Sequence, residues 1–277
     1  MPRFSLRKQP PPIVLLTDFG YKDSYVGVMK GVIRGICAEA DVLDLSHNIV
    51  PQDVAEAAFV LAASYRYFPT DSIFTCVVDP GVGTTRAVLC MKANEQTFLA
   101  PDNGLLSVIA DEAEPEEIRR VTAQEYYLES QSATFHGRDI FAPVAAHLAD
   151  GLSTEKLGPM ARHIQHLQLP NPVRAADGSL RGEIIYIDQF GNLITNIRQS
   201  TIERSFSVPP DELEVTVKRR SMKGLAGTYA DRPPGELMAL VGSSGYLEAA
   251  VNKGSAAQVL GCEKGDTVTL SPTAEGA

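Results

Sequence analysis

Residues 13–37 read IVLLTDFGYKDSYVGVMKGVIRGIC, which is a short apolar run, a polar loop and an amphipathic stretch. The run Ile13–Asp18 is apolar at nearly every position, as is typical of a strand buried on both faces of a sheet. Over Ser24–Cys37 the apolar residues recur every three or four positions, which predicts a helix. A strand followed at once by a helix is the repeating unit of α/β proteins with a mostly parallel sheet.

This alternation continues as far as residue 168. Strands are predicted at Val42–Ser46 and Ser72–Asp79, and a helix at Asp53–Phe68 with Asp53 as its N-cap. Two hairpin strands, a short helix, a strand and a last helix are expected at Ala87–Lys92, Thr97–Ala100, Gly104–Asp111, Ile118–Val121 and Arg138–Asp150. We therefore expect an α/β domain over residues 13–168, with helices on both faces of its sheet.

The sequence changes character after this first part. Prolines and polar residues interrupt the pattern between Leu157 and Asp177, which predicts a linker. From Arg181 onward only strand-like runs remain, at Glu183–Ile187, Leu193–Ile197, Leu213–Val217, Glu236–Val241, Tyr246–Val251 and Thr267–Leu270. Short strands joined by Gly and Pro turns predict a small β-sandwich or β-barrel-like domain over residues 181–271.

The composition is that of an ordinary globular protein. The 277 residues include 25 Lys and Arg against 34 Asp and Glu, so the net charge is −9 and a nucleic-acid partner is not expected. No apolar stretch is as long as a membrane span. The four cysteines form no CxxC pair, so we expect no disulfide framework or zinc site. We also expect no cofactor and no other metal. Residues 1–12 lack the apolar region of a signal peptide, which predicts a flexible leader and a cytoplasmic protein.

The loop between the first predicted strand and helix carries two carboxylates in the motif TDFGYKDSYVG. Asp18 and Asp23 follow the carboxyl end of a strand, where ligands bind in open α/β sheets. Carboxylates there can accept hydrogen bonds from a ribose diol or bind an ammonium group. The alternative is structural, with Asp18 as a turn residue and Asp23 or Ser24 as the N-cap of the helix.

Two further motifs of the first domain hold an ion pair and a histidine. VVDPGVGTTR carries Asp79 into a Pro-Gly turn, from which Arg86 can return to pair with it. TFHGRDIFAP places His136 just before a helix, with Gly137 leaving space beside it. Taken singly, the first motif is equally typical of a hairpin corner with a surface ion pair, and the second of a surface histidine or a helix cap.

Two loops of the second domain are unusually polar or small. IDQFGNLITNI contains Asp188, Phe190 and Asn192, and an amide can read an adenine edge while an aromatic ring stacks on it. VGSSGYLEAAVNKG contains Ser243 and Ser244 in a turn whose backbone N–H groups could bind a carboxylate. The structural alternatives are a β-turn at Phe-Gly-Asn and another hairpin.

In this order, the motifs TDFG, VDPGVG with its following arginine, APDNGLL, FHGRD and FGNLITN resemble the DUF62 family of S-adenosyl-L-methionine (SAM) hydrolases. These are the adenosine-forming SAM hydroxide adenosyltransferases, relatives of fluorinase and chlorinase. The resemblance runs from Ile13 to Leu270 and implies an α/β domain, a β-barrel-like domain and homotrimers with sites between subunits. It also implies hydrolysis of SAM to adenosine and L-methionine by an activated water that attacks ribose C5′.

The resemblance implies a role for each residue that matches a family motif. Asp79, Arg86 and His136 would form the catalytic set, with Asp18 on the ribose diol. The other substrate contacts would be Asp23 and Asp188 near the methionine ammonium and carboxylate, Phe190 and Asn192 at adenine, Ser243 and Ser244 at the methionine carboxylate, and Tyr246 and Val251. Which residue accepts the proton of the water stays open, since an unperturbed histidine such as His136 is poised to take a proton near neutrality and Asp79 is suited to orient water.

Departures from the halogenating relatives favour water as the nucleophile. Those relatives carry a serine in place of Gly137, an arginine in place of Ser244, and no counterpart of Asp79. An anion near the line of attack repels a halide and accepts a hydrogen bond from water. The alternatives are a SAM-dependent halogenase at the same pocket and a non-catalytic protein that binds SAM or adenosine.

Overall fold

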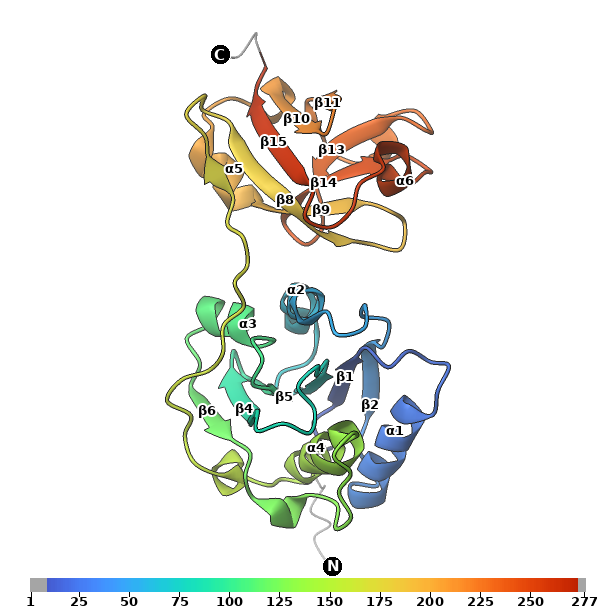
Figure 1. Cartoon of the computed structure of the whole chain (residues 1–277), viewed down its shortest axis with the longest axis vertical. Helices are drawn as coiled ribbons and strands as arrows, with labels where there is room; N and C mark the ends of the chain where they lie inside the picture. The colour runs from blue at the N-terminus through green and yellow to red at the C-terminus, as the bar shows by residue number, and fades with distance from the viewer. Residues whose placement is uncertain (1–8, 274–277) are drawn as a thin grey trace, which may run out of the picture. The chain divides into compact units, whose positions relative to one another are not determined.

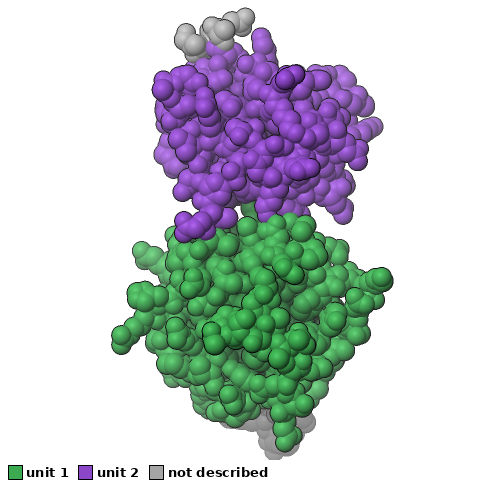
Figure 2. Space-filling view, in the orientation of Figure 1, with its two compact units in different colours: residues 1–167 green, residues 168–277 purple. Residues whose placement is uncertain are grey.

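The computed structural model describes residues 9–273 and divides into two compact units, Met1–Leu167 and Gln168–Ala277 (Figure 2). The first eight residues of the predicted leader lie outside the described residues. Within the described range, no helix is long and apolar enough to cross a membrane. The domain limits expected from the sequence, 13–168 and 181–271, stay a prediction.

A six-stranded sheet forms the centre of the described part of the first unit (Figure 1). In spatial order its strands are β2 (Val42–Ser46), β1 (Ile13–Thr17), β3 (Ile73–Val77), β5 (Gln96–Pro101), β4 (Val88–Ala93) and β6 (Glu117–Arg120). Strands β2, β1, β3 and β5 are parallel, and β4 is reversed, because it is antiparallel to both β5 and β6. The mostly parallel sheet and the predicted hairpin of β4 and β5 are confirmed.

Helices cover both faces of this sheet, because successive side chains of a strand point to opposite faces. Ile13 and Leu15 of β1 pack with α1 (Tyr25–Ile36) and α4 (Ala142–Ala149) on one face. The alternate residues of β1 pack on the other face with α2 (Val54–Ser64) and α3 (Ser107–Glu112). The predicted N-cap of α2 is confirmed, since the Asp53 carboxylate accepts a hydrogen bond from the Glu56 N–H at 2.9 Å.

The last predicted helix of this unit has two parts. A π-helical turn, Gly137–Phe141, runs directly into α4, and His136 stands at the start of that turn. Single π-helical turns occur frequently at functional sites. Three short 3₁₀ turns complete the helical segments described in this unit, at Tyr65–Tyr67, Gln124–Tyr126 and Thr154–Leu157.

The second unit is a nearly closed, barrel-like sheet, which confirms that part of the predicted fold (Figure 1). In spatial order its strands are β11 (Arg220–Lys223), β10 (Leu213–Val217), β15 (Thr267–Pro272), β8 (Leu180–Ile187), β9 (Leu193–Arg198), β14 (Tyr246–Val251), β13 (Leu237–Val241) and β12 (Leu225–Ala226), with β7 (Val173–Arg174) paired to β8. Alternate strand residues such as Val215, Ala249 and Leu270 are buried in one apolar core.

The expectation that only strands follow Arg181 was wrong. Two helices, α5 (Gln199–Ser205) and α6 (Ala256–Leu260), lie between strands, as do 3₁₀ turns at Pro210–Glu212 and Tyr229–Asp231. Ser255 caps α6, because its Oγ accepts a hydrogen bond from the N–H of the residue three positions later at 3.2 Å. Helices of seven and five residues are too short to show an apolar period, so the pattern did not reveal them.

Candidate active site

A pocket of about 360 Å³ opens in the first unit beside the carboxyl ends of β1 and β3. Its lining combines two carboxylates and a histidine with three aromatic rings, namely Asp18, Asp79, His136, Phe19, Tyr25 and Phe135. A larger cavity of about 640 Å³ lies near the amino ends of the same strands, beside Pro12 and Ile73, and none of the predicted site residues lines it. Converging titratable groups mark the smaller pocket as the candidate site.

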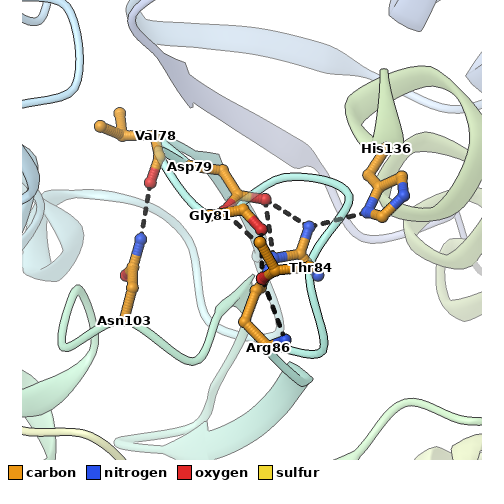
Figure 3. Close-up of polar contacts among 7 residues, drawn as sticks. All are labelled: Val78, Asp79, Gly81, Thr84, Arg86, Asn103 and His136. Atoms are coloured by element: carbon orange, nitrogen blue, oxygen red, sulfur yellow. Dashed lines mark hydrogen bonds and ion pairs between the residues drawn. The ribbon is translucent and has the colours of Figure 1, made fainter. Parts of the chain in front are cut away.

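Asp79, Arg86 and His136 form one hydrogen-bonded chain at this pocket (Figure 3). The Arg86 guanidinium donates from Nε to Asp79 Oδ1 at 3.1 Å and to Oδ2 at 2.8 Å, and from Nη2 to Oδ2. The same Nη2 lies 2.8 Å from His136 Nδ1. The side chains of Asp79 and Arg86 are only 4% and 10% exposed, so the predicted catalytic set is a nearly buried, connected group.

The turn between Asp79 and Arg86 is shaped so that the two side chains meet. The Thr84 hydroxyl donates to the Gly81 carbonyl at 2.7 Å and closes the turn (Figure 3). Gly83 has a φ of 78°, and a Cβ there would lie 2.5 Å from a backbone carbonyl oxygen of a neighbouring loop. Only glycine fits that position, so the Gly-rich motif is required by the shape of the turn.

Asn103 supports the strand end that carries Asp79. Its Nδ2 donates to the Val78 carbonyl at 2.9 Å, and its Oδ1 accepts a hydrogen bond from the Leu105 N–H at 3.2 Å (Figure 3). The side chain therefore joins two loops at the edge of the sheet. Asn103 belongs to the motif APDNGLL, which supports the family resemblance but for which no residue role was predicted.

Arg86 also determines the protonation of His136. An arginine side chain only donates hydrogen bonds, so His136 Nδ1 accepts, and the proton of the neutral imidazole lies on Nε2. Burial, together with the adjacent Arg86 cation, lowers the pKa of His136 below its ordinary value, and this outweighs the opposite effect of Asp79. The neutral ring therefore has an N–H donor at Nε2, and its one acceptor nitrogen, Nδ1, already accepts a hydrogen bond from Arg86.

Asp18 lies in the same pocket, directly after β1, as the sequence predicted. Its Oδ2 accepts a hydrogen bond from the Gln52 N–H at 2.8 Å. Gln52 has a φ of 68°, a left-handed backbone conformation that is uncommon for residues other than glycine. Two carboxylates from adjacent strand ends, Asp18 and Asp79, therefore line one pocket.

Aromatic side chains close the pocket beside Gly137. The rings of Phe19, Tyr25 and Phe135 pack against one another, with centroid distances of 5.6, 5.8 and 5.0 Å. A Cβ at Gly137 would lie 3.2 Å from both Met29 Sδ and the Phe135 ring. The expectation that Gly137 leaves space was wrong, because sulfur and aromatic carbons already fill that space.

Asp23 is exposed and does not line this pocket. The N-cap of α1 is Ser24, and its side chain makes no capping hydrogen bond. The structure therefore brings Asp18, Asp79 and His136 together at one pocket but leaves Asp23 on the surface of the loop.

In the second unit, Asp188 and Asn192 shape a tight turn between β8 and β9. Asp188 Oδ1 accepts hydrogen bonds from the N–H groups of Phe190 and Asn192, and Oδ2 accepts from the Asn192 side-chain amide, each at 2.9 Å. Asn192 is buried, whereas the Phe190 ring is 68% exposed. Gly191 has a φ of 81°, and a Cβ there would collide with Ser255. The β-turn at Phe-Gly-Asn, which was the structural alternative for this motif, is therefore present, and it leaves the Phe190 ring exposed.

Ser243 and Ser244 lie at the tip of the hairpin between β13 and β14. The Gly242 N–H donates to the Tyr246 carbonyl at 2.9 Å, and the Gly245 N–H donates to the Gly242 carbonyl at 2.9 Å. These two hydrogen bonds close the loop and leave the serines between them. The hairpin is thus present, with two small residues at its tip.

The side chains of Tyr246 and Val251 contact other residues of the second unit and leave little surface for a ligand. The Arg198 guanidinium lies 4.9 Å from the Tyr246 ring centroid, and Val251 is part of the second unit's core.

A buried acid in the same strand, β14, was not predicted from the sequence. Glu248 is 5% exposed and accepts a hydrogen bond from the Tyr229 hydroxyl, and burial raises its pKa. A glutamate within a strand of apolar residues was the available signal.

Among residues 9–273, no group of three His, Cys, Asp or Glu side chains is placed to hold a metal ion. The four cysteines are buried and unpaired, and burial raises the pKa of Cys90 to about 12. The first unit's pocket offers carboxylates, hydrogen-bond donors and aromatic surface. That combination suits a polar small molecule with hydroxyl groups and a positive charge.

Comparisons with known proteins agree over both units. The models of the SAM hydroxide adenosyltransferase N-terminal and C-terminal domains match residues 13–158 and 182–269. A protein of Thermus thermophilus named (R)-S-adenosyl-L-methionine hydrolase is 37% identical, over 94% of this chain and 99% of that protein. A fluorinase of Nocardia brasiliensis is 28% identical, over 94% of this chain and 96% of that protein.

A solved structure is similar as well. The crystal structure of an uncharacterized conserved protein from Thermotoga maritima matches with a TM-score of 0.87 and 41% identity, over 93% of this chain and 99% of that chain. The family models together cover most of both units, and the motifs quoted from the sequence fall within them. The chain belongs to the SAM hydroxide adenosyltransferase family.

Proposed function

We propose that this protein hydrolyses SAM to adenosine and L-methionine through a water molecule that attacks ribose C5′. The observation that carries the proposal is that Arg86 holds Asp79 and His136 together at the pocket that Asp18 also lines. Membership of the family and the 37% identity to a SAM hydrolase support the same reaction.

The reaction needs an oriented nucleophile more than a strong acid. In SAM, C5′ is bonded to a positively charged sulfur, so the bonding electrons leave with sulfur as the neutral thioether of methionine. The water oxygen forms the new C5′–O bond, and each turnover yields adenosine, L-methionine and one proton. Holding two reactants in line can lower a barrier by roughly 7–11 kcal/mol, so positioning is the main task of the site.

Asp79 is the residue to which we assign the water. Its carboxylate accepts a hydrogen bond from the water and then receives the proton. His136 is unsuited to that step, since Arg86 occupies Nδ1 and Nε2 is already protonated. The water oxygen becomes strongly acidic as it bonds to carbon, so even an arginine-paired carboxylate is basic enough. In this account His136 and Arg86 fix the direction of the Asp79 carboxylate.

The remaining contacts would bind the substrate. Asp18 is suited to a ribose diol because the Gln52 N–H holds one of its oxygens in place. Phe190, exposed beside the buried amide of Asn192, is suited to stack on adenine. Six further residues are proposed to contact SAM, either at its methionine part or through their backbone. They are Asp23, Asp188, Ser243, Ser244, Tyr246 and Val251.

A SAM-dependent halogenase is the second candidate, because a fluorinase is 28% identical over most of the chain. Asp79 argues against it, since two negative charges ~4 Å apart at an effective dielectric of ~20 repel by roughly 4 kcal/mol. Gly137 argues against it too, because it has no side-chain hydroxyl that could replace part of the hydration shell of a halide.

We further propose a cytoplasmic homotrimer built from an α/β domain (13–168) and a β domain (181–271), with each site shared between subunits. The pocket of the first unit is lined by first-unit residues, whereas the proposed adenine-binding turn belongs to the second unit. Unpaired, buried cysteines suit a reducing compartment. Co-refolding inactive Asp79→Ala with Asn192→Ala, assayed at SAM concentrations below KM, should give more activity than Asn192→Ala alone, and no gain would place each site within one chain.

The function is tested by incubating the pure protein with SAM and separating the products by chromatography. Adenosine and methionine in equal amounts, with one proton released per SAM in weak buffer, are expected. A 5′-halo-5′-deoxyadenosine formed in chloride or fluoride would instead identify a halogenase. Bound but intact SAM would identify a binding protein.

A further inference from the structure

A fully buried histidine outside the pocket has no part in the proposed chemistry. His47 is 0% exposed and follows β2. Its Nδ1 lies 2.8 Å from Thr17 Oγ1 at the end of β1, and its Nε2 lies 2.9 Å from Asp44 Oδ1 in β2. The Nε2 contact with Asp44 is close but does not meet hydrogen-bond geometry, so it brings the carboxylate against the ring without a well-directed hydrogen bond.

Asp44 is itself held by other side chains. Its Oδ2 accepts hydrogen bonds from Lys30 Nζ at 2.7 Å and from the Tyr21 hydroxyl at 3.3 Å. Burial raises the pKa of Asp44, but the hydrogen bond from Lys30 and the adjacent His47 ring outweigh the effect of burial, so the net pKa is lowered. Asp44 is therefore a carboxylate anchored to α1 and able to orient the His47 ring.

His47 is attached at several points to the loop that carries Asp18. The His47 ring contacts the Thr17 hydroxyl, whose oxygen also accepts a hydrogen bond from the Phe19 N–H at 3.2 Å. The backbone carbonyl of His47 accepts a hydrogen bond from the Gly20 N–H at 2.7 Å. The Tyr21 ring packs edge-on against the imidazole, with centroids 5.1 Å apart. Both ends of the Asp18 loop therefore contact one buried residue.

The chain Asp44–His47–Thr17 cannot reach a substrate. Thr17 and His47 are both 0% exposed, and neither lines the pocket. A hydroxyl that is buried in this way is not a nucleophile. What the three residues can do is fix the backbone from which Asp18 enters the pocket.

We propose that His47 is a positioning residue that sets the Asp18 carboxylate for the ribose diol of the substrate. The proposal rests on the proposed function, in which Asp18 binds ribose. Asp18 needs a fixed direction because a carboxylate must align both oxygens to accept from two neighbouring hydroxyl groups. The Gln52 N–H holds one oxygen, and His47 holds the loop on either side.

A double-mutant cycle with adenosine tests this role, with affinity measured by calorimetry on the full chain. His47→Ala should weaken adenosine binding about tenfold. In the Asp18→Ala background the same change should add less than about threefold, because His47 acts through Asp18. With SAM, His47→Ala should raise KM and leave kcat nearly unchanged. Thr17→Val keeps the side-chain shape and should reproduce these effects.

The controls separate positioning from simple loss of stability. His47→Asn retains a polar atom near the place of Nδ1 and should recover part of the affinity. His147→Ala removes a ring that packs on Tyr126 at 5.3 Å, away from the pocket, and should lower the melting temperature without changing adenosine affinity. If His47→Ala does not fold, the double-mutant cycle with Asp18→Ala is measured with Thr17→Val in its place.

The outcomes distinguish this proposal from the proposed function. Additive losses in the cycle, or a fall in kcat with KM unchanged, would overturn the positioning role. A wild-type protein that binds adenosine but leaves SAM intact would refute the hydrolase, while the cycle would still decide the role of His47. A wild-type protein that hydrolyses SAM but binds no adenosine would overturn the role of Asp18 and His47 in holding ribose and leave the hydrolase intact.

Discussion

The two units hold their candidate site residues in different ways. In the first unit, Arg86 and His136 are 50 residues apart in sequence and bond to each other at a pocket that also contains Asp79. In the second, Asp188 and Asn192 are four residues apart and bond to each other within one turn. The first arrangement joins distant segments of the chain around titratable side chains. In the second, the polar side chains form hydrogen bonds with each other that fix the shape of a loop.

This difference assigns different tasks to the two regions. Side chains that face a pocket and one another can act on a bound molecule without supporting the fold elsewhere. In the proposed function, side chains that shape a loop would contribute to recognition by fixing what the loop displays, here the exposed Phe190 ring. We therefore expect substitutions in the Asp79–Arg86–His136 group to change rate, and substitutions in the Asp188–Asn192 turn to change affinity and stability together.

Asp79→Asn should have the largest effect. The substitution keeps the size of the side chain and removes the negative charge that orients water, so kcat should fall about 10²–10⁴-fold with SAM binding largely retained. Asp111→Asn is the matched control, because Asp111 is 66% exposed and pairs with His166 outside this pocket. A mutant that keeps its rate, or that loses SAM binding in calorimetry, would contradict the assignment of the water to Asp79.

Asn192→Ala should come next. It removes the side-chain hydrogen bond to Asp188, so adenosine affinity should fall about tenfold. The melting temperature should fall by about 2–4 °C, in contrast to Asp79→Asn. Asn196→Ala, which breaks bonds to Glu183 and Pro170 in the same unit, should lower the melting temperature alone. Unchanged stability in Asn192→Ala would remove the distinction between the two regions.

A smaller effect is expected from pH. Burial and the Arg86 cation lower the pKa of His136, so the ring stays neutral and bonded to Arg86 down to pH values below its ordinary ~6.5. The unfolded chain binds a proton there first, so stability should fall as the pH drops below ~6.5, and activity should fall at a lower pH, where the folded ring itself is protonated. Arg86→Gln should raise the pKa of His136, as followed by NMR of the ring protons. A His136 that titrates above 6.5 in the wild type would contradict this electrostatic account.

Gly137→Ser should have the smallest effect. Its Cβ would lie 3.2 Å from Met29 Sδ, a contact that a flexible side chain can relieve by a small shift. We expect a loss of activity of a few-fold and no halogenated nucleoside in high chloride, since Asp79 still repels the anion. Halogenated product from this variant would show that Gly137, and not Asp79, selects the nucleophile.

Much of the fold could be predicted from the sequence. Buried parallel strands such as Ile13–Thr17 are continuous apolar runs, and α1 repeats its apolar residues every turn. The short helices α5 and α6 could not be predicted, because five to seven residues do not complete two turns.

The site was predictable in part, for reasons that are equally physical. The Asp79–Arg86 pair lies within one turn, so its spacing indicated the contact, whereas the link to His136 depended on the family resemblance. The filled space beside Gly137 comes from Met29, far away in sequence, and no local pattern could show it. No motif singled out His47, and only its tertiary contacts with Thr17 and Asp44 distinguish it.

The most direct test of the central claim is hydrolysis of SAM in ¹⁸O-labelled water, with the products analysed by mass spectrometry. Attack of water on C5′ puts one labelled oxygen on the 5′ position of adenosine and none into L-methionine. Chloride or fluoride in excess should change neither product. Adenosine without the label, or a 5′-halogenated nucleoside in its place, would contradict water as the nucleophile oriented by Asp79.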